Sequence, residues 1–554
     1  MATDAERVQA QPGATPPRGR SALAGRLALV VVCLAVFLSA LDQTVVVTAL
    51  LPIIRDIGAP ITRPDRAAWI VSGYLLGYVI ALPLMGRVAD VYGRRLVFIV
   101  SLALFAFGSL FCALAPALGG PIAPDPTTLD GAILSPLYTL ANWLLEQLAH
   151  FGLDISLPAL NLLIGARFVQ AIGGGALVPV AMAVAGDLFG PTRRGLALGL
   201  IGGVAEAGGV LGPLWGAAIT TRWGWQWIFY INVPIAAALI VAGWLTLRSG
   251  RRARGGIDLL GALLFGACLT CLAVGFGPQT GSIDVFQPRG AIQPNHWLLA
   301  ASGVFLLLFI GLESALRSPL IEVRAFRNRA FASAAALSLF VGVALIVAMV
   351  LIPLFISTLQ SAPDTFAGGL ALLHMTALIP VGAFAGGWLA NRFSCPLPAA
   401  LGSVLTAIGL VLMSQWPANV SPEQITVATV IAGLGFGLSI APISTSALNA
   451  AKVGQEGMAA SVVTVLRMTG MIVGLASLTL WALTRLQTLL AAANIAQNGA
   501  AAALGVLRQV YGELFLVAAA IALVSIVPAL LLWRKPRARV AGVEEKAVQS
   551  YAAL

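Results

Sequence analysis

Four ionisable residues lie in the middle of long apolar segments: Asp42, Arg167, Glu206 and Arg467. A charge at the centre of a bilayer is costly, so two acids and two bases at this depth indicate a functional site in a membrane protein. A carboxyl group there can take up and release a proton near neutral pH unless a cation holds it ionised. Asp42 is the only carboxylate of its segment, so we expect it to carry protons. A permanently paired structural aspartate is the alternative.

The segment that contains Arg167 has polar and small residues on one side. Arg167, Gln170 and Gly174 are spaced i, i+3 and i+7, so they share one face if the segment is a helix. An arginine on such a face can act in proton transfer, or it can serve structure alone by bonding to backbone carbonyls.

A stripe of small residues marks another apolar segment. Gly202, Glu206, Gly209, Pro213 and Gly216 follow one another at i, i+4, i+7, i+11 and i+14, which places them along one helix face. Small residues let a second helix pack closely, and the proline bends the segment. Packing does not need the glutamate, so we expect Glu206 to titrate or to pair with a base.

Arg467 is a candidate for that base. It shares a helix face with Thr464, Gly470 and Gly474 in a late apolar segment. Because its charge is opposite to that of Glu206 and the two segments belong to different halves of the chain, we expect a Glu206–Arg467 bridge between the halves.

The composition identifies the kind of protein that contains these residues. Of 554 residues, 59% are hydrophobic and 10% are charged, which leaves too little polar surface to coat a soluble globule. With ~20 apolar residues per crossing, the sequence has about fourteen membrane spans. Most lysines and arginines fall in the loops on the side of the N-terminus. The positive-inside rule therefore predicts a multi-pass membrane protein with both termini in the cytoplasm.

The same sequence argues against several other classes of protein. The formal net charge is +11, but the charges sit in short clusters between apolar runs, which is typical of membrane topology and not of nucleic-acid binding. The 5 cysteines fall in or beside apolar segments, so we expect no disulfide and no metal site. The sequence has no phosphate-binding loop and no nucleophile with a placed base, so we expect no enzyme and no cofactor, with protons as the coupling ion.

The most specific pattern is GRVADVYGRR, ten residues between two apolar runs. We expect a tight cytoplasmic turn that joins two membrane helices. Gly86 and Gly93 permit a tight backbone, while Asp90, Arg94 and Arg95 supply charge at helix ends, where the helix dipoles are near. The alternative is that these charges only fix the topology.

This loop resembles the signature loop of the major facilitator superfamily, between its second and third helices. In that family the aspartate and the following arginine clamp neighbouring helix ends and act in conformational switching, which implies Asp90 and Arg94. LDQTVVVTALLP, with Asp42, resembles the first-helix pattern of the family, and RFVQAIGGG resembles a fourth-helix pattern with Ala171 in place of a glycine. The family places this arginine in the proton path, so the resemblance implies that Arg167 partners Asp42.

Other segments extend the resemblance. GGVAEAGGVLGPLWG resembles the motif of exporters in this superfamily, whose glycine face packs against a helix of the opposite bundle. GWLANR at 387–392 repeats the loop in the second half, with Asn391 in the place of Asp90. Apolar segments at 258–277 and 297–315 lie between the halves. The plan resembles the fourteen-helix drug:proton antiporter branch.

The resemblance implies an all-α polytopic membrane fold of two six-helix bundles plus two linker helices. The expected parts are a disordered cytoplasmic tail (1–25), an N-terminal bundle (26–247) with an outer insertion and an amphipathic helix (116–158), two linker transmembrane helices (248–330), a C-terminal bundle (331–534) with an outer helical hairpin near 485–508, and a cytoplasmic tail (535–554).

The functional hypothesis is proton-driven export of hydrophobic or amphiphilic compounds by alternating access, as in drug:proton antiport. VVVTALLPIIRDIGAPI and WIVSGYLLGYVIALPLMGR most resemble mycobacterial lipid exporters that act with a periplasmic lipoprotein, which implies export of a triacylglyceride-like or glycolipid-like molecule as an alternative. A non-transporting sensor or scaffold is expected if the buried charges serve only structure. The expected partners are the bilayer, a hydrophobic small molecule or lipid, and a periplasmic lipoprotein. We expect a monomer that binds no nucleic acid.

Overall fold

The computed structural model describes most of the apolar part of the chain. The described residues are 20–57, 64–118, 139, 158–188, 191–247, 258–276, 294–316, 319–360, 365–450, 456–492 and 495–532. The expected tail at 535–554, and most of the expected tail at 1–25 and insertion at 116–158, lie outside them. The side chains of Asp90 and Glu206 are also outside the described part.

All regular elements in the described residues are helices, as the composition predicts. The first half contains α1 (Arg20–Asp56), α2 (Pro64–Tyr92), α3 (Arg94–Leu118), α5 (Pro158–Leu188), α6 (Pro191–Trp223) and α7 (Gln226–Thr246). Two helices and a short 3₁₀ turn follow: α8 (Leu259–Gly275), α9 (His296–Ala315) and η1 (Val323–Arg327). The second half contains α10 (Arg329–Leu359), α11 (Thr365–Phe393), α12 (Pro396–Ser414), α13 (Pro422–Ala450), α14 (Glu456–Ala492), α15 (Ile495–Val524) and α16 (Ile526–Leu531).

The helices satisfy the physical demands of a bilayer, in which each backbone polar group must be bonded within its own segment. In the described part, 12 helices are long and apolar enough to cross a membrane, and α8 is apolar but shorter. A topology of fourteen spans therefore stays a prediction.

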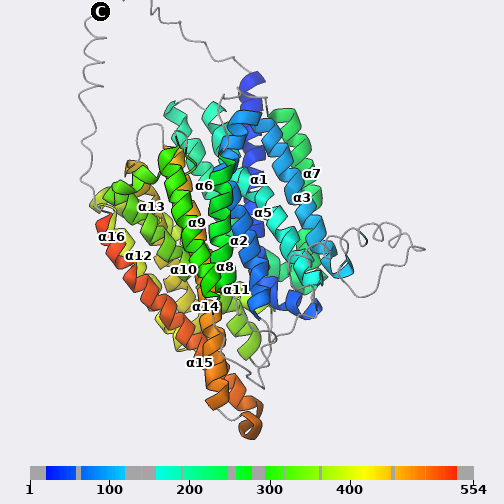
Figure 1. Ribbon diagram of the computed structural model, residues 1–554, viewed down its shortest axis with the longest axis vertical. Helices are drawn as coiled ribbons and strands as arrows, with labels where there is room; N and C mark the ends of the chain where they lie inside the picture. The colour runs from blue at the N-terminus through cyan, green and yellow to red at the C-terminus, as the bar shows by residue number, and fades with distance from the viewer. Residues whose placement is uncertain are drawn as a thin grey trace, which may run out of the picture.

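The two halves use the same packing scheme. In the first half, α1 packs along α6, α5 packs between α2 and α3, and α3 contacts α7. In the second half, α10 packs along α14, α13 packs between α11 and α12, and α12 contacts α15. The halves meet in an equally symmetric way, because α6 contacts α11 and α2 contacts α14 (Figure 1). The repeat at the α2–α3 and α11–α12 turns is thus one local sign of a repeat of whole helices.

The last long helices form a projecting hairpin. α14 has 37 residues, which is ~56 Å at 1.5 Å per residue against a hydrocarbon core of ~30 Å. α14 and α15 extend past the other helices at the lower end of the view (Figure 1). Arg485 donates to both carboxylate oxygens of Glu513, at 2.7 and 2.9 Å, and so joins the two helices.

Candidate functional site

The structure brings Asp42 and Arg167 together in the core of the first half. Asp42 lies in α1 and Arg167 in α5, and their side chains are 0% and 1% exposed. Arg167 Nη1 donates to Asp42 Oδ2 at 2.6 Å, and Nη2 donates to the backbone oxygen of Asp42 at 3.3 Å. This is the pairing that the sequence predicted from the resemblance.

Two amides complete the shell around the Asp42 carboxylate. Gln170 Nε2 donates to Asp42 Oδ1 at 3.0 Å, and Asn232 Nδ2 donates to the same oxygen at 2.7 Å. Gln170 also accepts from Arg167 Nη1 at 2.7 Å and donates to the Ser109 hydroxyl at 2.6 Å. Side chains from α5 and α7 therefore bond both oxygens of one buried carboxylate of α1, and Ser109 of α3 bonds to the two amides, so these buried polar groups have partners.

Close helix contacts and an aromatic ring hold Arg167 in place. A Cβ added at Gly108 of α3 would lie 2.5 Å from the backbone nitrogen of Gln170, so only glycine permits this approach. The Arg167 guanidinium stacks over Tyr74, with Cζ 4.0 Å from the ring centroid, and lies 5.6 Å from Phe229. These faces attract a cation. Arg167 Nε is buried and has no hydrogen-bond partner in the part of the chain that the structure describes.

Sequence reasoning missed three residues of this site: Asn232, Ser109 and Tyr74. Asn232 had a usable signal, because an amide in the middle of an apolar span has to be bonded inside the protein. Ser109 and Tyr74 had none, since serine and tyrosine are common in such spans and their faces depend on tertiary packing.

The predicted Glu206–Arg467 bridge lies partly outside the described part. Glu206 belongs to α6, but its side chain is not described. Arg467 is a half-buried residue of α14, and its backbone oxygen lies against Gly342 of α10. The bridge therefore stays a prediction.

The small-residue stripe of α6 divides into two faces. Gly216 lies against α1 together with two glycines outside the stripe, Gly208 and Gly212, and a Cβ added at Gly208 would be 2.6 Å from the Phe37 oxygen. At Gly202 and Gly209, no described atom lies within 4 Å of such a Cβ. The glycine face packs against α1 of the same half, and not against the opposite half as the resemblance implied.

A different face of α6 meets the opposite half. The Thr376 hydroxyl of α11 donates to the backbone oxygen of Val210 at 3.0 Å. A Cβ added at Gly369 of α11 would lie 2.3 Å from Ala217 Cβ and 3.1 Å from the backbone oxygen of Pro213. The contact between halves is thus made beside the proline bend, by the residues that directly follow the glycines in the sequence.

The charged loop joins α2 to α3 and contacts two other helices. Gly93 has φ +98°, and this left-handed conformation makes the tight turn. Arg94 Nη1 donates to the backbone oxygen of Ala183, near the C-terminal end of α5. Arg95 places Cζ 5.0 Å from the ring centroid of Trp244 in α7. These contacts clamp three helix ends on one side of the first half, next to Gly86, whose added Cβ would be 3.5 Å from Pro179.

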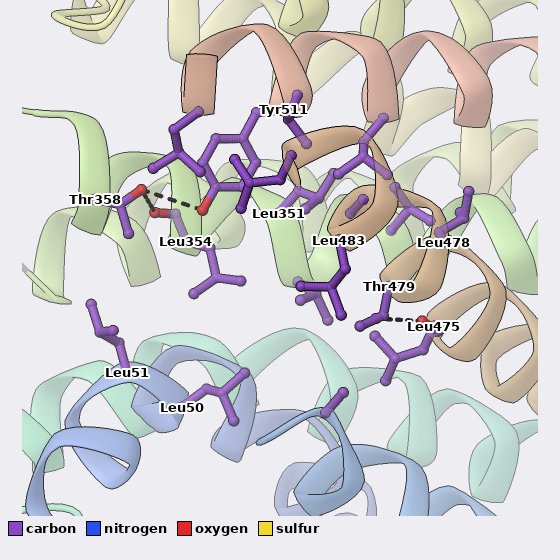
Figure 2. Close-up of a pocket in the computed structure, with 18 of the residues that line it drawn as sticks. Leu50, Leu51, Leu351, Leu354, Thr358, Leu475, Leu478, Thr479, Leu483 and Tyr511 are labelled. Atoms are coloured by element: carbon purple, nitrogen blue, oxygen red, sulfur yellow. Dashed lines mark hydrogen bonds between the residues drawn. The ribbon is translucent and has the colours of Figure 1, made fainter. Parts of the chain in front are cut away.

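A large apolar cavity lies between the two halves (Figure 2). Its volume is about 380 Å³. The first half contributes residues of α1 and α2, such as Leu50 and Leu51, and the second half contributes residues of α10, α14 and α15, such as Leu351 and Leu483. Among the described residues the lining contains no charged side chain, so the cavity suits an apolar ligand.

The comparison with protein families decides the family. A model of the Major Facilitator Superfamily matches residues 32–475. The chain belongs to this superfamily.

Two solved structures share its fold. A bacterial homologue of the human lysosomal transporter Spinster, inward-facing and occupied, has a TM-score of 0.57 at 16% identity and covers 95% of this chain and 100% of its own. A D-xylose–proton symporter has a TM-score of 0.55 at 14% identity, with 90% and 97% covered.

Curated relatives match over most of their length. A triacylglyceride transporter of Mycobacterium tuberculosis is 34% identical over 550 residues, which cover 94% of this chain and 97% of the relative. A triacylglyceride transporter of Mycobacteroides abscessus is 33% identical over 468 residues, with 82% and 81% covered. This chain is therefore a multi-pass membrane transporter of the major facilitator superfamily and not an enzyme, and the expected all-helical fold is confirmed.

Proposed function

We propose that this protein exports a neutral lipid of the triacylglyceride class across the bacterial cytoplasmic membrane in exchange for protons. The apolar cavity between the halves carries the proposal, because its described lining has no charged side chain and only three hydroxyl groups. Drugs with polar or charged groups would leave those groups without partners in such a wall, which is costly. Lipid export therefore replaces drug:proton antiport as the preferred function, in keeping with the names of the relatives.

The position of the cavity supports transport by alternating access. Its walls come from both halves of the molecule, so rocking one half against the other would open it to one side and then to the other. A ligand held there would contact α1 and α2 in one half and α10, α14 and α15 in the other.

The Asp42–Arg167 pair is our proposed proton-coupling site. Protonation of Asp42 cancels the charge that faces Arg167 and removes one acceptor from the shell, so the pair has two bonding states. We also propose that Glu206 and Arg467 form a bridge between the halves that is made in one access state and broken in the other. Glu206→Gln and Arg467→Ala should then both impair transport, and exchanging the two charges should restore part of it.

The proposed setting follows from the charge distribution and the projecting hairpin. Both termini face the cytoplasm, fourteen helices cross the membrane, and the α14–α15 hairpin lies on the outer side. Apolar residues of this hairpin, including Leu486 and Leu490, line the cavity, so they would extend an apolar wall beyond the bilayer toward a periplasmic lipoprotein. The Asp90 loop on the opposite side is the proposed conformational switch.

Transport into inverted membrane vesicles tests the proposal. A labelled triacylglyceride and a lipophilic cationic dye are followed in parallel under an imposed pH gradient. We expect uptake of the lipid that a protonophore abolishes. Uptake of the dye without the lipid would favour drug efflux. Uptake of neither, by folded protein, would favour a sensor or scaffold.

A further inference from the structure

The cavity has very few polar groups on its wall. Its lining is apolar except for the hydroxyls of Thr358, Thr479 and Tyr511. In a wall of this kind each hydroxyl hydrogen has to find an acceptor, because an unbonded polar group in an apolar site is costly. The acceptor of each hydrogen therefore shows which hydroxyl can still donate a hydrogen bond to a ligand.

The two threonines use their hydrogens on their own helices. Thr479 Oγ1 donates to the backbone oxygen of Leu475 at 2.6 Å, and Thr358 Oγ1 donates to that of Leu354 at 2.7 Å. A threonine hydroxyl has a single hydrogen, so neither can donate to a second group at full strength. Neither threonine therefore has a hydroxyl hydrogen left for a ligand.

Tyr511 differs from the threonines. Its hydroxyl oxygen lies 3.3 Å from Thr358 Oγ1 (Figure 2). Thr358 Oγ1 is the donor in this contact, which is longer than the ~2.7–2.8 Å usual for hydroxyl donors. The hydrogen of Tyr511 has no acceptor among the described residues, so it is the one hydroxyl hydrogen of the described lining that a ligand can accept.

The ring of Tyr511 is fixed. It packs edge-on against Phe355, with centroids 5.7 Å apart at 62°, and the residue is 8% exposed. The donor is thus preorganised next to Leu354 and Leu514, which also line the cavity and exclude water. A hydrogen bond made in such surroundings is stronger than one made in water.

We propose that Tyr511 donates to an ester carbonyl of the transported lipid, and that this bond distinguishes an acyl ester from a hydrocarbon of the same size. The inference rests on the proposed function and names the group that the cavity recognises. A ligand with a carbonyl gives the Tyr511 hydrogen an acceptor, whereas an alkane has no acceptor and a trialkyl ether has none at the position of the carbonyl oxygen.

A comparison of ester and ether ligands tests this role. Purified protein in detergent is titrated with a fluorescent triacylglyceride analogue and with its trialkyl ether, which has the same chains and no carbonyl. We expect the wild type to bind the ester about tenfold more tightly, and Tyr511→Phe to bind both ligands with the affinity of the ether. Tyr230→Phe makes the same chemical change in α7, away from the cavity, and should keep the preference. Size-exclusion profiles and unfolding temperatures show whether each variant is folded.

Two binding results would contradict the role of Tyr511. Equal binding of ester and ether by the wild type would overturn the inference, and so would an equal loss for both ligands in folded Tyr511→Phe. Thr358→Val offers a second arm, since it removes the neighbouring hydroxyl and keeps the Tyr511 donor, so it should preserve the ester preference. Binding needs no proton gradient. A preference for the ester without transport would therefore overturn the proposed function and leave the recognition of the ester standing.

Discussion

Gly93 and Ser394 adopt the same left-handed backbone conformation at equivalent turns of the two halves, with φ values of +98° and +106°. Gly93 joins α2 to α3, and Ser394 joins α11 to α12. The repeat has thus kept the backbone of the turn while losing the glycine that suits it. A serine in this left-handed conformation has a steric clash that glycine does not have.

Ser394→Gly is predicted to stabilise the protein slightly. Relief of the left-handed strain is worth ~1–2 kcal/mol, and the greater freedom of glycine in the unfolded chain offsets ~0.4–1 kcal/mol of it. Gly93→Ala is the matched opposite change, and it should destabilise by strain alone because no described atom lies within 4 Å of the added Cβ. Thermal unfolding of both variants in the same detergent measures the two effects. A drop in unfolding temperature for Ser394→Gly would contradict the prediction.

Asp42→Asn is predicted to abolish gradient-driven transport, by roughly 100-fold or more. Asparagine keeps an acceptor for Arg167 and the shape of the site, but it cannot bind and release a proton. Export down a lipid gradient should persist if the protein still alternates between states. The measurement compares lipid uptake with and without an imposed pH gradient. Concentrative uptake by this variant would exclude Asp42 as the proton carrier.

Thr44→Val is predicted to destabilise the α1–α6 contact by ~1–3 kcal/mol. Pro213 has no N–H to give the backbone oxygen of Gly209, and the Thr44 hydroxyl donates to that oxygen at 3.0 Å. Valine has the same shape and no donor, so the oxygen would be left unbonded. Thr44→Ser keeps the hydroxyl and is the control. Equal unfolding temperatures for Thr44→Val and wild type would show that another group satisfies the Gly209 oxygen.

Shortening the hairpin is predicted to impair lipid export and to have little effect on dye export. Replacing residues 485–508 by a short turn removes Leu486, Leu490 and Leu507 from the cavity wall. The loss exposes the acyl chains of a lipid to water, at about 0.8 kcal/mol for each methylene group, but it matters little for a dye without long acyl chains. Parallel transport of both compounds is the measurement. Unchanged lipid export would mean that the hairpin has no part in the lipid path.

The sequence by itself determined the class of protein and the local geometry. Long apolar runs can only be membrane helices, because the bilayer offers no partner for backbone polar groups. Helical spacing placed Arg167, Gln170 and Gly174 on one face, and the loop pattern located the turn at Gly93. The resemblance of the motifs around Asp42 and Arg167 to those of the superfamily implied their pairing before the fold was known.

Only the tertiary structure decided which faces meet. It brought Asn232 to Asp42 and Ser109 to the amides beside it, and it turned Gly208, Gly212 and Gly216 of α6 toward α1, while Gly202 and Gly209 have no described atom within 4 Å of an added Cβ. It also assembled the cavity, whose walls come from five helices spread along the chain. Periodicity fixes the faces of each helix, but the choice of neighbour depends on the fit between side chains that are hundreds of residues apart, and no local pattern records that fit.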